Sequence, residues 1–202
     1  MTVIGLTGSI GMGKTTAAAA FRDMGIPVHD ADAAVHALLA AGGAGVKAVS
    51  AAFPETLETD DRGNACIDRK ALGRIVFGND THKKKLEDIL HPMVRAASDA
   101  FVAAMKEKGH DLVVLDIPLL FETGGEKRVD ITLCVTAPPD VQRARVLARG
   151  GMTEERLAQI LAGQMPDAEK RRRADYVVAT DKGLDDMRHR LEEIVRRIRA
   201  ES

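Results

Sequence analysis

Short apolar runs rich in β-branched residues alternate along the chain with longer segments whose apolar residues recur at helical spacing. The first run, 3–7, leads through glycines into an alanine-rich stretch, 14–24, which predicts a strand, a loop and a helix. A second strand is expected at 27–30, and a helical pattern covers 32–41. These segments predict a β-α-β unit.

Three later strands and three later helices follow from the same patterns. The strands are expected at 112–117, 131–135 and 176–179. The helices are expected at 138–149, 153–165 and 184–199. Five strands alternating with helices predict an α/β fold in which a parallel sheet carries helices on both faces.

The segment between the second and third strands is predominantly helical in pattern, and no strand is expected there. Its expected breaks are Pro54, the polar turn 59–64, Gly78-Asn79 and Pro92. We therefore predict one domain, 1–202, with a core made of about 1–32, 110–138 and 174–202. A helical insertion is expected at about 33–109 and a helical lid at about 139–173.

Residues 8–15 match the phosphate-binding pattern GxxxxGK[ST] between the first strand and its helix. Glycines let the backbone N–H groups face phosphate oxygens, and the helix N-terminus favours the same negative charge. Lys14 is expected at the β- and γ-phosphates, Thr15 on Mg²⁺ and Thr16 near the α-phosphate. The expected ATP-binding residues are Gly8, Gly11, Met12, Gly13, Lys14, Thr15 and Thr16. A glycine-rich turn that binds nothing is the alternative.

Carboxylates follow two of the other predicted strands. Asp116 ends the run LVVLD and is a candidate magnesium ligand, or alternatively a turn residue before Pro118. Asp30 and Asp32 follow the second strand, which we expect beside the phosphate-binding turn. Asp32 is the candidate base that accepts a proton from an attacking hydroxyl. A turn and a helix N-cap are the alternative roles for these two acids.

Arginines cluster on the helix expected at 138–149, which stops at a glycine pair. A mobile lid that closes arginines over ATP would neutralise phosphoryl charge and exclude water. Arg143 and Arg149 are better candidates for this role than Arg145. A solvated charged face is the alternative.

Composition excludes several classes of protein. The 29 basic and 30 acidic residues nearly cancel, and only 3% of residues are aromatic, which disfavours a nucleic-acid partner. The two cysteines lack metal-ligand spacing, and no apolar run reaches membrane-spanning length, so we expect a soluble, cytoplasmic protein. The guanine-specifying NKxD motif of GTPases is missing.

The order of the motifs along the chain resembles that of the dephospho-CoA kinase family. The motifs are the phosphate-binding turn, the HDAD segment, His91-Pro92, DIPLLFE, the arginine helix and Gln164-Met165-Pro166. The resemblance covers nearly the whole chain. It implies a P-loop kinase that uses Mg²⁺ and ATP to phosphorylate the 3′-hydroxyl of dephospho-CoA, the last step of CoA synthesis. It places Asp32 at the base position, Asp30 and Asp32 at the acceptor, and His91 in a helical insertion that receives CoA. A packed histidine is the alternative for His91.

One departure from the family pattern concerns the nucleotide base. Ala179-Thr180 stands where the family commonly has an Asp-Asn pair near adenine, which leaves strict selection of ATP open. Another small-molecule or nucleoside-monophosphate kinase of this fold is the first alternative function, and a non-catalytic nucleotide-binding regulator is the second. We expect a monomer or a weak homo-oligomer.

Overall fold

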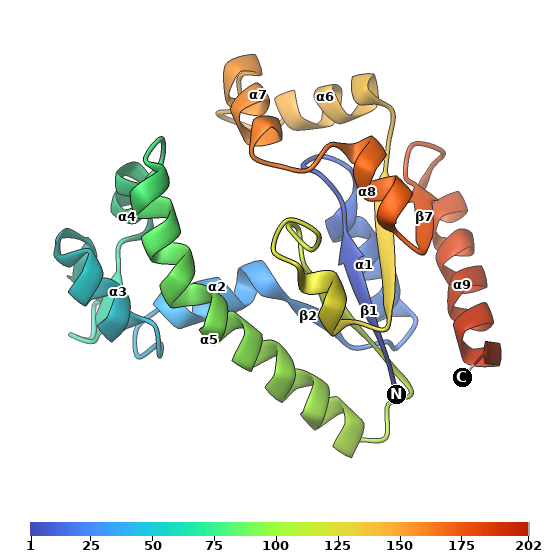
Figure 1. Cartoon of the computed structure of the whole chain (residues 1–202), viewed down its shortest axis with the longest axis horizontal. Helices are drawn as coiled ribbons and strands as arrows, with labels where there is room; N and C mark the ends of the chain where they lie inside the picture. Colours follow the sequence, from blue (N-terminus) through green and yellow to red (C-terminus); the bar gives the residue numbers. More distant parts are fainter. Residues whose placement is uncertain (202) are drawn as a thin grey trace. The chain divides into compact units, whose positions relative to one another are not determined.

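A five-stranded sheet with the order β2-β5-β1-β6-β7 forms the centre of the fold in this computed structural model, which describes residues 1–201 (Figure 1). Strand β1 pairs in parallel with β5 and β6, and β6 pairs in parallel with β7. The strands are β1 Thr2–Thr7, β2 Val28–Asp30, β5 Leu112–Asp116, β6 Ile131–Thr136 and β7 Tyr176–Ala179. The predicted α/β class and the five-stranded sheet are confirmed.

The chain divides into two compact units. Residues 1–29 together with the chain from Val102 onward form the first, and residues 30–101 form the second. Helices of the first unit are α1 Lys14–Asp23, α6 Pro139–Leu147, α7 Glu154–Ala162, α8 Asp167–Arg173 and α9 Leu184–Glu201, with a short 3₁₀ turn at Gly125–Arg128. Within residues 1–201, no helix is both long and apolar enough to cross a membrane.

The second unit is mainly helical and has its own apolar core. Its elements are α2 Ala31–Leu39, α3 Val46–Ala52, a 3₁₀ turn at Pro54–Thr56, β3 Leu57–Thr59, β4 Ala65–Ile67, α4 Arg69–Val76 and most of α5 Asp80–Glu107. Val49, Phe53 and Leu90 are among its buried core residues.

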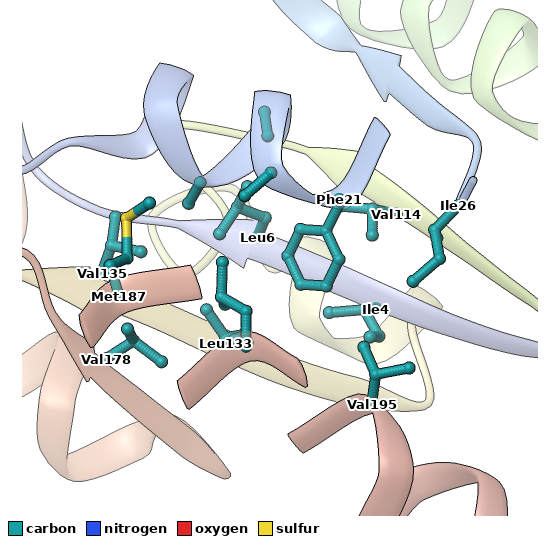
Figure 2. Packing of buried hydrophobic residues seen from close by; sticks show 14 of the residues in the cluster. Ile4, Leu6, Phe21, Ile26, Val114, Leu133, Val135, Val178, Met187 and Val195 are labelled. Atoms are coloured by element: carbon teal, nitrogen blue, oxygen red, sulfur yellow. The ribbon is translucent and has the colours of Figure 1, made fainter. Parts of the chain in front are cut away.

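One face of the central sheet packs against α1 and α9. Side chains alternate along a strand, so Ile4 and Leu6 of β1 point to this face. Phe21 of α1 and Val195 of α9 pack in the same cluster, as Figure 2 shows. The apolar spacing in both helices thus faces the sheet, as predicted.

The opposite face of β1 meets the segment that follows β5. A Cβ atom on Gly5 would lie 3.0 Å from side-chain atoms of both Leu120 and Val129. The Thr7 hydroxyl donates a hydrogen bond of 3.0 Å to the Pro118 carbonyl. The last residue of β1 is therefore tied to the chain leaving β5.

Two expectations about the segment between β2 and β5 are wrong. A short antiparallel hairpin, β3–β4, lies where no strand was expected; of the expected polar turn 59–64, Thr59 ends β3 and residues 60–64 form the loop. Asp60 closes that loop by accepting the backbone N–H groups of Arg62 and Asn64. Strands of three residues are too short to display an alternating pattern.

Pro92 does not break the chain, because α5 runs through it without a stop. Proline removes one backbone hydrogen bond, yet the flanking turns pack Ile89, Leu90 and Met93 against the core of the second unit. Tertiary packing thus maintains the helix across the proline.

The strand order also differs from the expectation that β2 lies beside the strand leading into the phosphate-binding turn. β5 is the neighbour of β1, and β2 lies one strand further out.

Helix α8 was not expected, although Pro166, early acidic residues and the late basic run 170–173 are signals for it.

Phe21 supports a stability prediction because its side chain is fully buried between sheet and helices. The substitution Phe21→Ala should cost about 3–5 kcal/mol of unfolding free energy in chemical denaturation. Leu184→Ala removes a side chain that is 59% exposed and should change that free energy by less than about 0.5 kcal/mol. Equal effects of the two substitutions would contradict the packing described here.

Candidate active site

The turn between β1 and α1 has the backbone shape that binding phosphate requires. Gly11 and Gly13 adopt left-handed φ angles of 76° and 90°. Helix α1 begins at Lys14, and the Gly13 carbonyl accepts its first backbone hydrogen bonds, from Thr16 and Ala17. The N-terminal end of α1 therefore lies at this turn, where its orphan N–H groups and dipole favour an anion.

Gly8 allows the turn to approach the sheet. A Cβ atom there would lie 2.6 Å from Cγ2 of Val135 and 2.8 Å from the Val135 carbonyl oxygen. One of these contacts is with backbone, which cannot rotate away. Only glycine fits at this position without moving β6.

Lys14 and Asp116, both predicted from the sequence, are brought together. The Lys14 ammonium lies 2.6 Å from Oδ1 of Asp116 and donates a hydrogen bond to it. Their side chains are 16% and 3% exposed, so water screens the pair only weakly. Asp116 is opposite Leu6 in the β1–β5 register, which places its carboxylate at the strand end beside the turn.

The oxygen groups around this pair fit a magnesium ion that also binds nucleotide phosphates. Thr15 is exposed in the first turn of α1, and Asp116 supplies a carboxylate. Among residues 1–201, no cluster of three His, Cys, Asp or Glu side chains could hold a metal alone. Magnesium commonly takes one or two protein oxygens and completes its shell with phosphates and water, so this donor set suits it.

Two glutamines hold the outer side of the turn at Ile10. The Ile10 carbonyl accepts from Nε2 of Gln142 at 2.8 Å, and the Ile10 N–H donates to Oε1 of Gln164 at 3.1 Å. Gln142 belongs to α6, whereas Gln164 follows α7. Both ends of the segment that carries α7 are thereby attached to the same residue of the turn.

Arg145 and Thr180 fix the next part of the turn. Arg145 donates to the hydroxyl of Thr180 at 2.8 Å and to its carbonyl at 2.6 Å, and it reaches the Gly11 carbonyl at 3.5 Å. The Thr180 hydroxyl donates in turn to the Met12 carbonyl at 2.9 Å. The loop after β7 is therefore connected to the phosphate-binding turn through one arginine.

The arginines ranked highest from the sequence lie on exposed positions. Arg143 forms an ion pair with Glu154 at the start of α7, and its side chain is 63% exposed. Arg149 is exposed just beyond the end of α6. The structure thus places Arg145 against the turn and leaves these two at the surface of the segment expected to form a lid.

Three predicted residues belong to the second unit. The carboxylate of Asp30 accepts the N–H of Ala33 and caps α2, so one of the alternative roles weighed for it is present. Asp32 is exposed in the first turn of the same helix. His91 is half-buried inside α5.

Comparison with known proteins decides the family. A family model described as dephospho-CoA kinase matches residues 2–186. A dephospho-CoA kinase of Mesorhizobium japonicum is 51% identical over 201 residues, covering 100% of this chain and 98% of that protein. The chain belongs to the dephospho-CoA kinase family. The family resemblance predicted from the motifs is confirmed, and with it an ATP-dependent kinase.

Solved structures agree with this assignment. A crystal structure from Thermus thermophilus has a TM-score of 0.78 and 37% identity, covering 99% of this chain and 97% of that one. The dephospho-CoA kinase from Campylobacter jejuni has a TM-score of 0.72 and 25% identity, covering 97% and 96% of the two chains.

In this member of the dephospho-CoA kinase family, sequence reasoning missed the residues that support the turn from outside. Gln142 and Gln164 both lie within segments that the motifs singled out, but an amide side chain has no pattern that reveals its partner. Thr180 was noted only as a departure from the family pattern. Its place against the turn is visible only in the structure, where a Cβ atom on Gly13 would lie 3.0–3.1 Å from the Thr180 side chain.

The close approach at Gly8 predicts a sharp sensitivity to one methyl group. Gly8→Ala should lower the unfolding midpoint and weaken ATP binding by about tenfold or more, since the new Cβ displaces either the turn or β6. Calorimetric titration with ATP and thermal unfolding measure the two effects.

Gly73 in α4 provides the matched control, because a Cβ atom added there would meet nothing within 4 Å. Gly73→Ala should leave ATP binding unchanged and raise stability slightly, by about 0.5–1 kcal/mol. Normal ATP affinity in Gly8→Ala would contradict the assignment of this turn.

Proposed function

We propose that this protein transfers the γ-phosphoryl group of ATP to the 3′-hydroxyl of dephospho-CoA and so forms CoA, the last step of CoA biosynthesis. The observation that carries the proposal is a full-length family match on a chain whose Lys14 and Asp116 lie 2.6 Å apart at the phosphate-binding turn. A cation at the start of α1 and a carboxylate at the end of β5 suit a bound nucleotide with its metal.

ATP binding is assigned to the turn and the start of α1. Backbone N–H groups at the start of α1 would face the phosphates, and Lys14 would exchange Asp116 for the β- and γ-oxygens. Thr15 and Asp116 would hold Mg²⁺, which supplies charge neutralisation of the phosphates when bound. Thr16 is assigned to the α-phosphate.

The acceptor is assigned to the second unit. Asp32 accepts the proton of the 3′-hydroxyl and orients that oxygen towards phosphorus, and Asp30 and His91 contribute to acceptor binding. The exposure of Asp32 supports this role, since the carboxylate is accessible to a substrate. The region expected at about 33–109 would then receive the CoA portion.

The lid is assigned to residues 139–173. Arg143 and Arg149 are exposed and available to close over ATP, although Arg143 must first exchange its partner Glu154. Arg145 joins them because its guanidinium already contacts the turn at Gly11. Its bonds to Thr180 support a role for the loop after β7 in holding the nucleotide. A cytoplasmic location and a monomeric or weakly associating state stay predictions.

A coupled assay of ADP release tests the substrate. With ATP and Mg²⁺, we expect release with dephospho-CoA that is about a hundredfold or more above release with AMP, cytidylate or shikimate. Preference for another acceptor would indicate a different small-molecule kinase of this fold. ATP binding without turnover on any acceptor would indicate a non-catalytic regulator.

Asp32→Asn tests the base. Turnover should fall by about two orders of magnitude or more, because a positioned base contributes about 10²–10⁴ in rate, while ATP binding measured by calorimetry stays unchanged. Asp23→Asn is the control, since Asp23 is a 61% exposed carboxylate paired with Arg188 on the surface. Wild-type turnover in Asp32→Asn would remove this residue from the mechanism.

A further inference from the structure

Lys170 is a fully buried cation in α8, with a side chain that is 0% exposed. Its ammonium donates to Oε1 of Glu122 at 2.9 Å and to the Pro118 carbonyl at 2.9 Å. Both acceptors lie on the chain that leaves β5, shortly after Asp116. The cation therefore attaches α8 to the exit of the strand that carries the candidate metal ligand.

A buried ion pair is a costly way to hold a helix in place. Removing an ammonium from water costs several kcal/mol, and well-packed apolar residues of similar volume are often equally or more stable. Water is excluded from the Lys170 side chain, which is 0% exposed, and Cys134 of β6, which α8 packs against, is buried as well. What the ammonium supplies beyond an apolar side chain is directed hydrogen bonds to two specified acceptors.

The first acceptor links Lys170 to β1. The Pro118 carbonyl accepts from Lys170 and also from the hydroxyl of Thr7, at 3.0 Å. Thr7 is the last residue of β1, directly before Gly8. One carbonyl oxygen thus fixes α8, the start of the phosphate-binding turn and the exit of β5 relative to one another.

The second acceptor links Lys170 to the opposite side of the turn. Oε1 of Glu122 also accepts the backbone N–H of Met165 at 2.8 Å. The preceding residue, Gln164, accepts the Ile10 N–H. By fixing Glu122, Lys170 therefore also fixes the backbone at 164–165 and the Gln164 side chain that accepts the Ile10 N–H.

We propose that Lys170 is a positioning residue for phosphoryl transfer. It touches no substrate; it sets the geometry between the phosphate-binding turn and the Asp116 carboxylate through Pro118 and Glu122. This role rests on the proposed kinase function. Phosphoryl transfer depends mostly on alignment, so a displacement of about 1 Å caused by a distant substitution can cost about 10²-fold in rate.

Lys170→Met is the first variant, because methionine is apolar and roughly fills the same space. We expect kcat with dephospho-CoA to fall about 10–100-fold. KM for ATP should stay within about threefold, since many backbone groups share ground-state binding while transfer alone needs the full alignment. The variant should also unfold at lower temperature, because Glu122, whose side chain is only 17% exposed, is left without its cation.

A double variant separates positioning from stability. Lys170→Met with Glu122→Gln removes both charges, and the glutamine carbonyl still accepts the Met165 N–H. Its unfolding midpoint should return to within a few degrees of wild type, whereas kcat should stay about tenfold low or lower because nothing replaces the bond to Pro118. Recovery of kcat together with stability would assign Lys170 a merely structural role and overturn the proposal.

Arg197→Met is the matched control, since Arg197 lies on α9 outside the lid, is 68% exposed and pairs with Glu201. It should keep wild-type kcat and unfolding midpoint. Wild-type kcat in Lys170→Met would overturn the positioning role alone. A wild-type protein that is inactive with dephospho-CoA would instead overturn the proposed function. The same variants are then compared with the acceptor that the substrate panel identifies. If no acceptor is turned over, both the proposed function and the positioning role are overturned.

Discussion

Backbone N–H groups that bind phosphate cannot at the same time donate to ordinary sheet or helix bonds. Peptide groups on the outer side of the phosphate-binding turn still need partners, because a buried unpaired N–H or C=O is costly. Here the partners come from side chains: Gln142 and Gln164 at Ile10, and Thr180 at Met12. The requirement that the inner side stay open thus dictates polar residues on several elements that surround the turn.

The same requirement explains which parts of the site could be predicted from the sequence. Residues 8–15 are contiguous in the sequence, and each glycine, lysine and threonine in the motif has a role within the turn itself. The motif can therefore be identified from the sequence alone. Gln164 lies 154 positions from Ile10, and Thr180 lies 168 positions from Met12. No periodicity or motif encodes such pairs, because they arise only when parallel strands bring distant segments to one edge of the sheet.

Fold prediction had a similar limit. Long elements such as α9 could be predicted because their apolar spacing extends over several turns, whereas the three-residue strands β3 and β4 carry too few positions to show a pattern. Strand order is also invisible to periodicity. The connection through α1 places β2 two positions from β1 in the sheet. β5, which follows the whole second unit in the sequence, lies between them.

The two glutamine contacts at Ile10 have a mechanical consequence. Gln142 and Gln164 lie on either side of α7 and attach both ends of the segment between them to Ile10, and Arg145 adds contacts to Gly11 and Thr180. None of these contacts involves residues 148–153, most of which are exposed between α6 and α7. Insertions or deletions between 148 and 153 should therefore change the length of this connection while the contacts that support the turn between β1 and α1 stay intact.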